Sequence, residues 1–288
     1  MDSFNRKKKL DVDAMLERGI ELYESVRLTE AFEYFDKINQ LKPEFVEAWY
    51  YKGKVAQKMS PKEPDYAIAC YDEAIRLNPE YVDAWIEKGI SLFEIEQFEA
   101  AIACYDQAIQ LSPEDSYAWL NKGSALSGLG RDVEAIACYD NAISFKTLSR
   151  KSEAVVYYNK GVALSQLEEY EDALFCYEKA IWCKHRFARA YENQSLTLYQ
   201  LKRYEDVVFC CKNFIRLFPQ IANPWNTKGS ALFKLGRYEE AIACYDEAIR
   251  LNLEGSNVWL NKGDALKKLG KDKEAEKCFA KARELDES

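Results

Sequence analysis

The sequence predicts an all-α solenoid, in which short helical hairpins stack one on another. Three observations support this fold class. The 288 residues include only 12 glycines and 7 prolines, too few for the frequent turns of a β-sandwich or barrel. A nearly constant segment recurs along the chain, with a period of 34 residues. Within each copy the apolar residues follow the spacing of amphipathic helices.

The repeated segment has two parts. In the first, an aromatic residue is followed by glycine four positions later, as in Trp49/Gly53, Trp85/Gly89, Trp119/Gly123, Tyr157/Gly161, Trp225/Gly229 and Trp259/Gly263. The second reads AIACYDEAI at residues 67–75 and 241–249, with close variants at residues 101–109 and 135–143. A diverged copy begins near Tyr191.

Each copy is expected to form one helical hairpin. Glycine inside a helix costs roughly 1 kcal/mol relative to alanine, so its recurrence indicates that the two helices cross closely there. Leu-Gly at residues 129–130, 235–236 and 269–270 predicts a left-handed cap after the first helix. Pro43, Pro79, Pro113 and Pro219 end the second helix. The extra residues at 60–65 and 150–153 are expected to be loops.

This pattern resembles the tetratricopeptide repeat (TPR) family. In the third copy the family signature reads Trp85, Gly89, Ala101, Tyr105, Ala108 and Pro113. The resemblance implies a right-handed α-superhelix, an α-solenoid of eight TPR helical hairpins. It divides the chain into an N-terminal basic segment, residues 1–11, and a single TPR array, residues 12–288. The repeats are residues 12–45, 46–81, 82–115, 116–149, 154–187, 188–221, 222–255 and 256–288.

The last copy differs from the others at two positions of its second helix. Where the middle copies have Ile, Leu or Val, it has Glu276 and Arg283. A stacking position that becomes charged indicates that no further repeat covers it. Residues 272–285 are therefore expected to form a polar cap at the end of the array.

Charge and hydropathy exclude two classes of partner. The formal net charge is −8 and the sequence pI is about 5.1, which disfavours nucleic acid because its binding depends on clustered lysine and arginine. The related pentatricopeptide arrays that bind RNA have a 35-residue period, which this chain lacks. No apolar stretch is long enough to cross a membrane or to serve as a secretory signal. A cytoplasmic protein with reduced thiols is expected.

The sequence shows no catalytic machinery. His185 is the only histidine, so no independent Cys-His or Ser-His-Asp set exists. No C-x-x-C spacing suggests zinc, and no glycine-rich phosphate loop is present. Seven of the nine cysteines occupy one repeat position, which indicates packing: Cys70, Cys104, Cys138, Cys176, Cys210, Cys244 and Cys278. We therefore expect no catalytic residue, no cofactor and no metal, and the protein is not expected to be an enzyme.

The resemblance to TPR proteins implies a concave groove lined by the first helices, which binds an extended peptide. Four copies place asparagine two positions after the signature aromatic, and a fifth places it one residue earlier: Asn121, Asn159, Asn193, Asn261 and, in the shifted copy, Asn226. This row resembles the asparagine ladder of long TPR arrays. A side-chain amide offers both a donor and an acceptor to a peptide bond. The alternative is that the amides only join neighbouring repeats.

Other groove residues are expected to add aromatic area and charge. Tyr158 and Tyr199 lie beside the asparagines. Carboxylates outnumber Lys54 and Lys58 in repeats 1–3, whereas Arg189 and Lys234 contribute to a small positive excess in repeats 6–8. This gradient predicts a ligand that is basic at one end and acidic at the other. The alternative is that the charges only hydrate the groove.

The outer face carries three unexpected aromatic residues. Phe175, Trp182 and Phe209 stand where most other copies have small or polar residues. Exposed apolar patches often mark interfaces, so these three residues form a candidate outer interface. The alternative is that Trp182 covers the loop of His185 and the phenylalanines cover neighbouring helices.

Together these features predict a non-catalytic scaffold or adaptor for protein–protein interaction. Its groove would bind an extended peptide segment of a partner protein. The alternative is a structural assembly protein that forms homo-oligomers through the outer aromatic residues. Neither hypothesis involves nucleic acid or a membrane.

Overall fold

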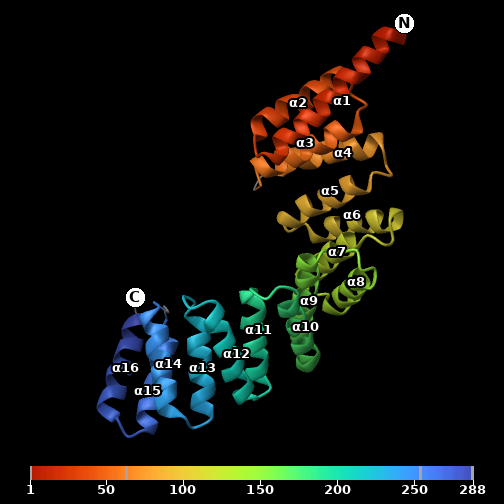
Figure 1. Ribbon diagram of the computed structural model, residues 1–288. Helices are drawn as coiled ribbons and strands as arrows, with labels where there is room; N and C mark the ends of the chain where they lie inside the picture. Colours follow the sequence, from red (N-terminus) through yellow and green to blue (C-terminus); the bar gives the residue numbers. More distant parts are fainter. Residues whose placement is uncertain (1, 62–63, 253–254, 287–288) are drawn as a thin grey trace. The chain divides into compact units, whose positions relative to one another are not determined.

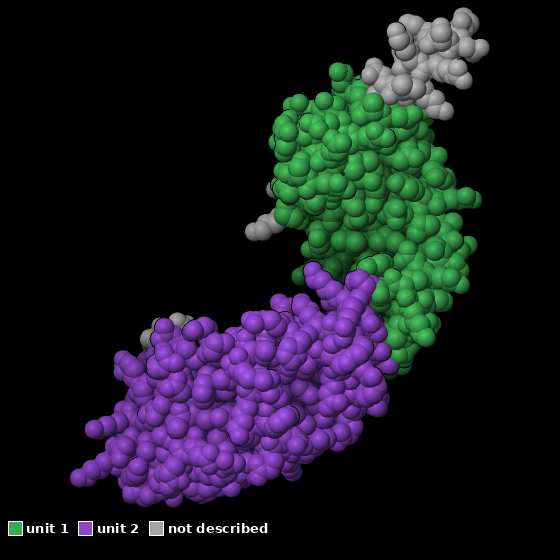
Figure 2. Space-filling model, viewed as in Figure 1, with its two compact units in different colours: residues 1–148 green, residues 149–288 purple. Residues whose placement is uncertain are grey.

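The computed structural model describes the backbone of residues 2–61, 64–252 and 255–286, and side chains from Val12 onward within these ranges. The chain divides into two compact units, unit 1 (Met1–Leu148) and unit 2 (Ser149–Ser288), which have different colours in Figure 2. Each unit contains four helical hairpins (Figure 1). The described residues form sixteen α-helices and no strand, which confirms the all-α solenoid. The single array of residues 12–288 stays a prediction.

The helices alternate between the first and second position of a hairpin. Unit 1 contains α1 (Asp2–Glu24), α2 (Leu28–Leu41), α3 (Val46–Met59), α4 (Asp65–Leu77), α5 (Val82–Glu94), α6 (Phe98–Leu111), α7 (Ser116–Gly128) and α8 (Asp132–Ser144). Unit 2 contains α9 (Arg150–Gln166), α10 (Tyr170–Cys183), α11 (Ala188–Gln200), α12 (Tyr204–Leu217), α13 (Asn223–Lys234), α14 (Tyr238–Arg250), α15 (Ser256–Lys268) and α16 (Asp272–Asp286).

The prediction that residues 150–153 form a loop is wrong. Residues 150–153 form the first turn of α9. Ser149 is the N-cap of this helix, and its hydroxyl accepts a hydrogen bond from the Ser152 backbone N–H at 3.1 Å. The inserted residues therefore lengthen a helix, because a serine stands where an N-cap is needed. In the other insertion Asp65 begins α4, and residues 62–63 lie outside the described part of the chain.

First helices pack more closely against one another than second helices do. In unit 1 the first helices α1, α3, α5 and α7 contact one another in sequence, as do α9, α11, α13 and α15 in unit 2. Within the described residues no two second helices approach each other in this way. The first helices therefore line the narrower, concave side of each unit, as a TPR hairpin stack requires.

The glycine of each first helix packs directly against an aromatic ring of the second helix. A Cβ built on Gly53 would lie 2.6 Å from Cε1 of Tyr71, and one on Gly229 would lie 2.6 Å from Cε1 of Tyr245. Both tyrosines are fully buried. The helices cross at a distance that only glycine allows, as the repeated glycine predicts.

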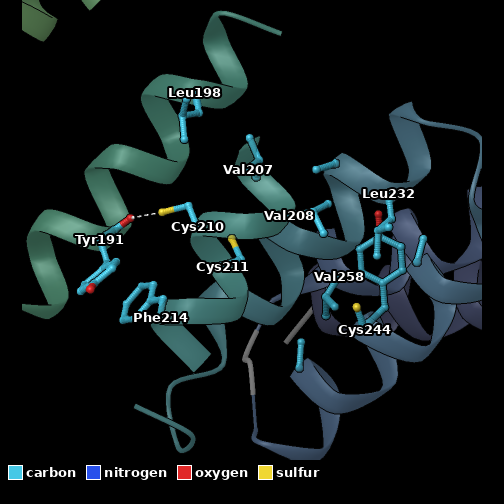
Figure 3. Packing of buried hydrophobic residues seen from close by; sticks show 14 of the residues in the cluster. Tyr191, Leu198, Val207, Val208, Cys210, Cys211, Phe214, Leu232, Cys244 and Val258 are labelled. Atoms are coloured by element: carbon cyan, nitrogen blue, oxygen red, sulfur yellow. Dashed lines mark hydrogen bonds between the residues drawn. The ribbon is translucent and has the colours of Figure 1, made fainter. Parts of the chain in front are cut away.

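In repeat 6 different residues pack where the two helices cross. Ser195 replaces the glycine, and Cys211 replaces the large aromatic residue opposite it. Phe214 stands where six of the other seven repeats have alanine, and its ring stacks on Tyr191 with centroids 5.8 Å apart. Figure 3 shows Cys211 and Phe214 inside the core of unit 2. The ring volume has moved one helical turn along α12, and both Cys211 and Phe214 are buried.

A left-handed residue ends the first helix in seven of the eight repeats. Three of these residues are the predicted glycines, such as Gly130 with φ 72°. The other four are Val26, Glu96, Glu168 and Lys202, with φ between 59° and 63°. Val26 has the least favourable side chain for this conformation, because a β-branched residue clashes with its own backbone there.

We expect Val26→Gly to stabilise unit 1 by about 1 kcal/mol. The left-handed conformation costs an L-residue roughly 1–2 kcal/mol, and the greater freedom of glycine in the unfolded chain offsets part of the gain. The Val26 side chain is 70% exposed, so its removal loses little packing. Urea unfolding followed by circular dichroism measures the change. Gly130→Val is the matched control and should destabilise the protein, while a V26G variant no more stable than wild type would contradict the argument.

Candidate functional site

All five predicted groove asparagines lie on first helices and are half-buried. Asn121 is on α7 of unit 1. The other four lie on successive first helices of unit 2: Asn159 on α9, Asn193 on α11, Asn226 on α13 and Asn261 on α15. Within unit 2 this placement forms a row of amides on successive first helices. The helical period predicts this row, because the asparagines occupy the same or adjacent positions in each repeat.

Three of these amides take part in two hydrogen bonds between neighbouring repeats. Asn193 Nδ2 donates to Tyr158 Oη at 3.4 Å, and Asn261 Nδ2 donates to Asn226 Oδ1 at 3.5 Å. Both distances are at the long end for hydrogen bonds, so the contacts are weak. The amides thus contact the neighbouring first helix and remain partly accessible. The contacts between neighbouring repeats are thus present, and binding of a peptide by these amides stays a prediction.

A hollow of about 280 Å³ lies beside Asn193. Its walls come from α9, α10 and α11 and combine apolar with polar side chains, among them Val162, Leu196 and Thr197. At its base Ser165 Oγ and Tyr177 Oη share a hydrogen bond of 3.0 Å. This hollow, which we call the inner pocket, has the size for one side chain of a ligand. Sequence reasoning missed it, because no single position of the repeat marks it.

The two predicted groove tyrosines have structural contacts as well. The Tyr158 ring lies 5.0 Å from the ring of Phe187, between centroids. The Tyr199 ring meets Tyr204 edge to face at 5.3 Å. Burial raises the pKa of Tyr199 above its ordinary value. Both rings are half-buried, so each is fixed in place and presents part of its surface.

The predicted basic groove residues differ in their pairing. Lys54 is half-buried, and its Nζ lies 3.2 Å from Glu87 Oε1 and 3.3 Å from Tyr50 Oη. Lys54 is therefore neutralised within unit 1. Arg189 and Lys234 are exposed and have no ion pair among the described residues of unit 2.

The first helices of unit 1 also carry carboxylates. Glu94 accepts a hydrogen bond from Gln57 at 3.2 Å. Exposed carboxylates without an ion pair within the described residues are Glu17, Glu24, Glu47 and Asp83. Lys58 lies over the ring of Tyr23, 3.7 Å from the centroid.

The cysteines are packing residues rather than nucleophiles. Eight of the nine thiols are buried and all nine are free. Burial raises the pKa of Cys70 and of Cys138 to about 11, so these thiols stay protonated near neutral pH. His185 is exposed after α10. Within the described residues, no group of three or more His, Cys, Asp or Glu side chains is placed to hold a metal ion.

The three outer aromatic residues are exposed. The exposed fractions are 56% for Phe175, 67% for Trp182 and 68% for Phe209. Arg150 stacks on Trp182 at 4.4 Å from the ring centroid, and its Nη2 donates to the Trp182 carbonyl at 3.1 Å. Trp182 and Phe209 border one hollow between α10, α11 and α12, which Phe175 does not line. The structure therefore brings two of the three together.

Comparison with known protein families agrees with this geometry. Family models described as tetratricopeptide repeat match residues 86–152, 154–187 and 256–288, and one described as TPR repeat matches residues 229–270. The chain belongs to the tetratricopeptide repeat family. A search of curated proteins found no match. TPR proteins in general act as scaffolds that bind other proteins.

Solved structures share the TPR fold at low sequence identity. YrrB, described as a TPR protein with an unusual peptide-binding site, is 20% identical with a TM-score of 0.56, over 63% of this chain and 92% of its own. PilF of Pseudomonas aeruginosa is 19% identical with a TM-score of 0.64, over 74% of this chain and 94% of its own. A TPR protein from Parabacteroides merdae is 13% identical with a TM-score of 0.60, over 88% and 98%. Within the described residues no helix is both long and apolar enough to span a membrane.

Proposed function

We propose that this TPR protein is a non-catalytic scaffold whose concave side binds an extended peptide segment of a partner protein. The row of amides from Asn159 to Asn261 on successive first helices of unit 2 carries this proposal. Half-buried amides fixed by neighbouring helices are pre-organised to bond a peptide backbone. The inner pocket beside Asn193 would accept one side chain of that peptide. The free thiols of all nine cysteines suit a reducing compartment such as the cytoplasm.

Charge gives the two units different preferences. In unit 1 the exposed carboxylates of the first helices favour a basic segment of the ligand, since the Lys54–Glu87 pair is neutral overall. In unit 2, Arg189 and Lys234 favour acidic residues in the ligand. We therefore propose a ligand that is basic at the end bound by unit 1 and acidic at the end bound by unit 2.

Selection from a displayed library of random peptides, followed by measured affinities, tests the groove. Asn193→Ala should weaken binding of a selected peptide by about 1–2 kcal/mol, because its hydrogen bonds to the peptide backbone are lost. The triple variant of Asn159, Asn193 and Asn261 to alanine should lose binding altogether. Asn141→Ala is the matched control, since this asparagine lies on the second helix α8. Undiminished affinity in the triple variant would overturn the proposal.

Self-association is the second candidate function, favoured by the exposure of Phe175, Trp182 and Phe209. A patch of this kind buries its apolar area when two copies meet. Sedimentation of the wild type and of the triple variant of these residues to serine measures it. An oligomer that the variant loses supports this candidate, and monomers in both samples eliminate it.

A further inference from the structure

Neighbouring repeats are joined by a recurring lysine–carboxylate pair. Four lysines, each three positions after the signature tryptophan, bond a carboxylate on the second helix of the preceding repeat. The pairs are Lys52–Asp36, Lys88–Asp72, Lys122–Asp106 and Lys262–Asp246, at 2.5 to 2.6 Å. Each ammonium also lies 5.2 to 5.9 Å from the ring centroid of its own tryptophan. A cation held between an aromatic face and a carboxylate is thus a standard part of this repeat.

Repeat 6 lacks the cation but keeps its carboxylate. Gln194 occupies the lysine position, and Glu178 on α10 occupies the carboxylate position sixteen residues earlier. Gln194 does not reach Glu178: its Oε1 accepts from Cys210 Sγ at 3.2 Å. Tyr191 replaces the tryptophan and is smaller. Glu178 is exposed and has no hydrogen bond or ion pair within the described residues.

The space that the lysine and tryptophan fill elsewhere is open here. A hollow of about 510 Å³, which we call the outer hollow, lies between α10, α11 and α12. Tyr191, Gln194 and Leu198 form part of its wall, and Trp182 and Phe209 border it. It is larger than the inner pocket, and the second helices α10 and α12 contribute much of its wall.

The charge of the outer hollow favours a cation. Glu178 and Asp206 line it, together with Arg203. The Arg203 guanidinium is already engaged, since its Nε lies 2.8 Å from Asp206 and its Nη1 lies 3.2 Å from Glu171. Glu178 remains as the unpaired carboxylate, beside two aromatic rings that are about two-thirds exposed. Arg150 shows that the Trp182 ring accepts a guanidinium, although Arg150 does not line the hollow.

We propose that the outer hollow binds an arginine side chain of a partner protein, with its guanidinium on Glu178 and its aliphatic stem between Trp182 and Phe209. The bound side chain takes the place that the array's own lysine has in four other repeats. A planar guanidinium suits this site, because it pairs with a carboxylate while stacking on an aromatic ring. The site gives the scaffold a second contact, separate from the concave side.

The test titrates N-acetyl-L-arginine amide into the full-length, isotope-labelled protein and follows NMR signals. A saturable shift of the Trp182 indole signal and of amides in residues 178–213 is expected, with a Kd of about 1–10 mM, as for a fragment of this size. The signal of Trp182 is assigned with the Trp182→Phe variant. N-acetyl-L-citrulline amide, which is neutral and nearly the same shape, should bind at least about tenfold more weakly.

Two variants locate the site. Gln194→Lys restores the residue that the other repeats have, so it should pair with Glu178, keep the fold and prevent binding of the arginine probe. Glu178→Gln should weaken binding at least about tenfold. Glu205→Gln makes the same charge change on α12 at a residue that does not line the hollow, and should bind as the wild type does.

Four results would overturn the proposal. They are the absence of a saturable shift, equal affinity for the citrulline probe, unchanged binding in the Gln194→Lys variant, and a wild-type dimer that blocks the probe. The last result would assign Trp182 and Phe209 to a second copy of the chain.

Discussion

Gly229→Ser is expected to destabilise unit 2 by about 2–3 kcal/mol. The new Cβ would lie 2.6 Å from Cε1 of Tyr245, a ring that is fully buried and cannot turn away. Overpacking of this kind typically costs 1–3 kcal/mol. Urea unfolding, with native-state hydrogen exchange to locate the loss in α13 and α14, measures the effect.

Repeat 6 supplies the compensation for this change. It combines Ser195, Cys211 and Phe214, so the corresponding set in repeat 7 is Gly229→Ser, Tyr245→Cys and Ala248→Phe. Tyr245→Cys alone should cost about 3 kcal/mol through the cavity it leaves. The triple variant should recover much of both losses, because the new ring fills that cavity as Phe214 does beside Tyr191. Strict additivity of the three single changes would contradict this account of the core.

The same example shows how far the sequence determines the fold. A fixed period, a glycine facing a ring and a left-handed residue after the first helix are local and repeated, so they can be predicted from residue types alone. Ser195 and Cys211 each look like a random loss of the signature. Only their contact in space shows that one change permits the other.

The candidate sites also contain some features that the sequence predicts and others that only the structure shows. The asparagine row is predictable because helical periodicity places like positions on one face. The link from Asn193 to Tyr158 joins residues 35 apart in the sequence and depends on the rotation between two repeats. The outer hollow is harder to predict from the sequence. It exists because Tyr191 and Gln194 fill less space than the tryptophan and lysine of other repeats. The missing lysine can be read from the sequence, whereas the role of Glu178 follows only from the lysine–carboxylate pairs of the other repeats.

Replacement of a buried amide in repeat 1 is expected to stabilise the protein, in contrast to Gly229→Ser. Asn39 on α2 is 6% exposed, and neither its Nδ2 nor its Oδ1 has a hydrogen-bond partner within the described residues. Repeats 2 to 7 all have isoleucine at this position, as in Ile75 and Ile109. A buried amide without partners costs about 1–3 kcal/mol on the scale of protein mutations.

Asn39→Ile is therefore expected to stabilise unit 1 by about 1–3 kcal/mol, and the added apolar contact between α2 and the next hairpin should raise that figure toward its upper end. Ile75→Asn is the matched control: it places the same amide at the same position one repeat later, and should destabilise unit 1 by at least as much. Urea unfolding gives the size of both changes, and slower amide exchange in α2 and α3 places the gain in the first two repeats. An Asn39→Ile variant less stable than the wild type would show that the amide is satisfied in solution, and that this repeat uses a polar contact where the others use an apolar one.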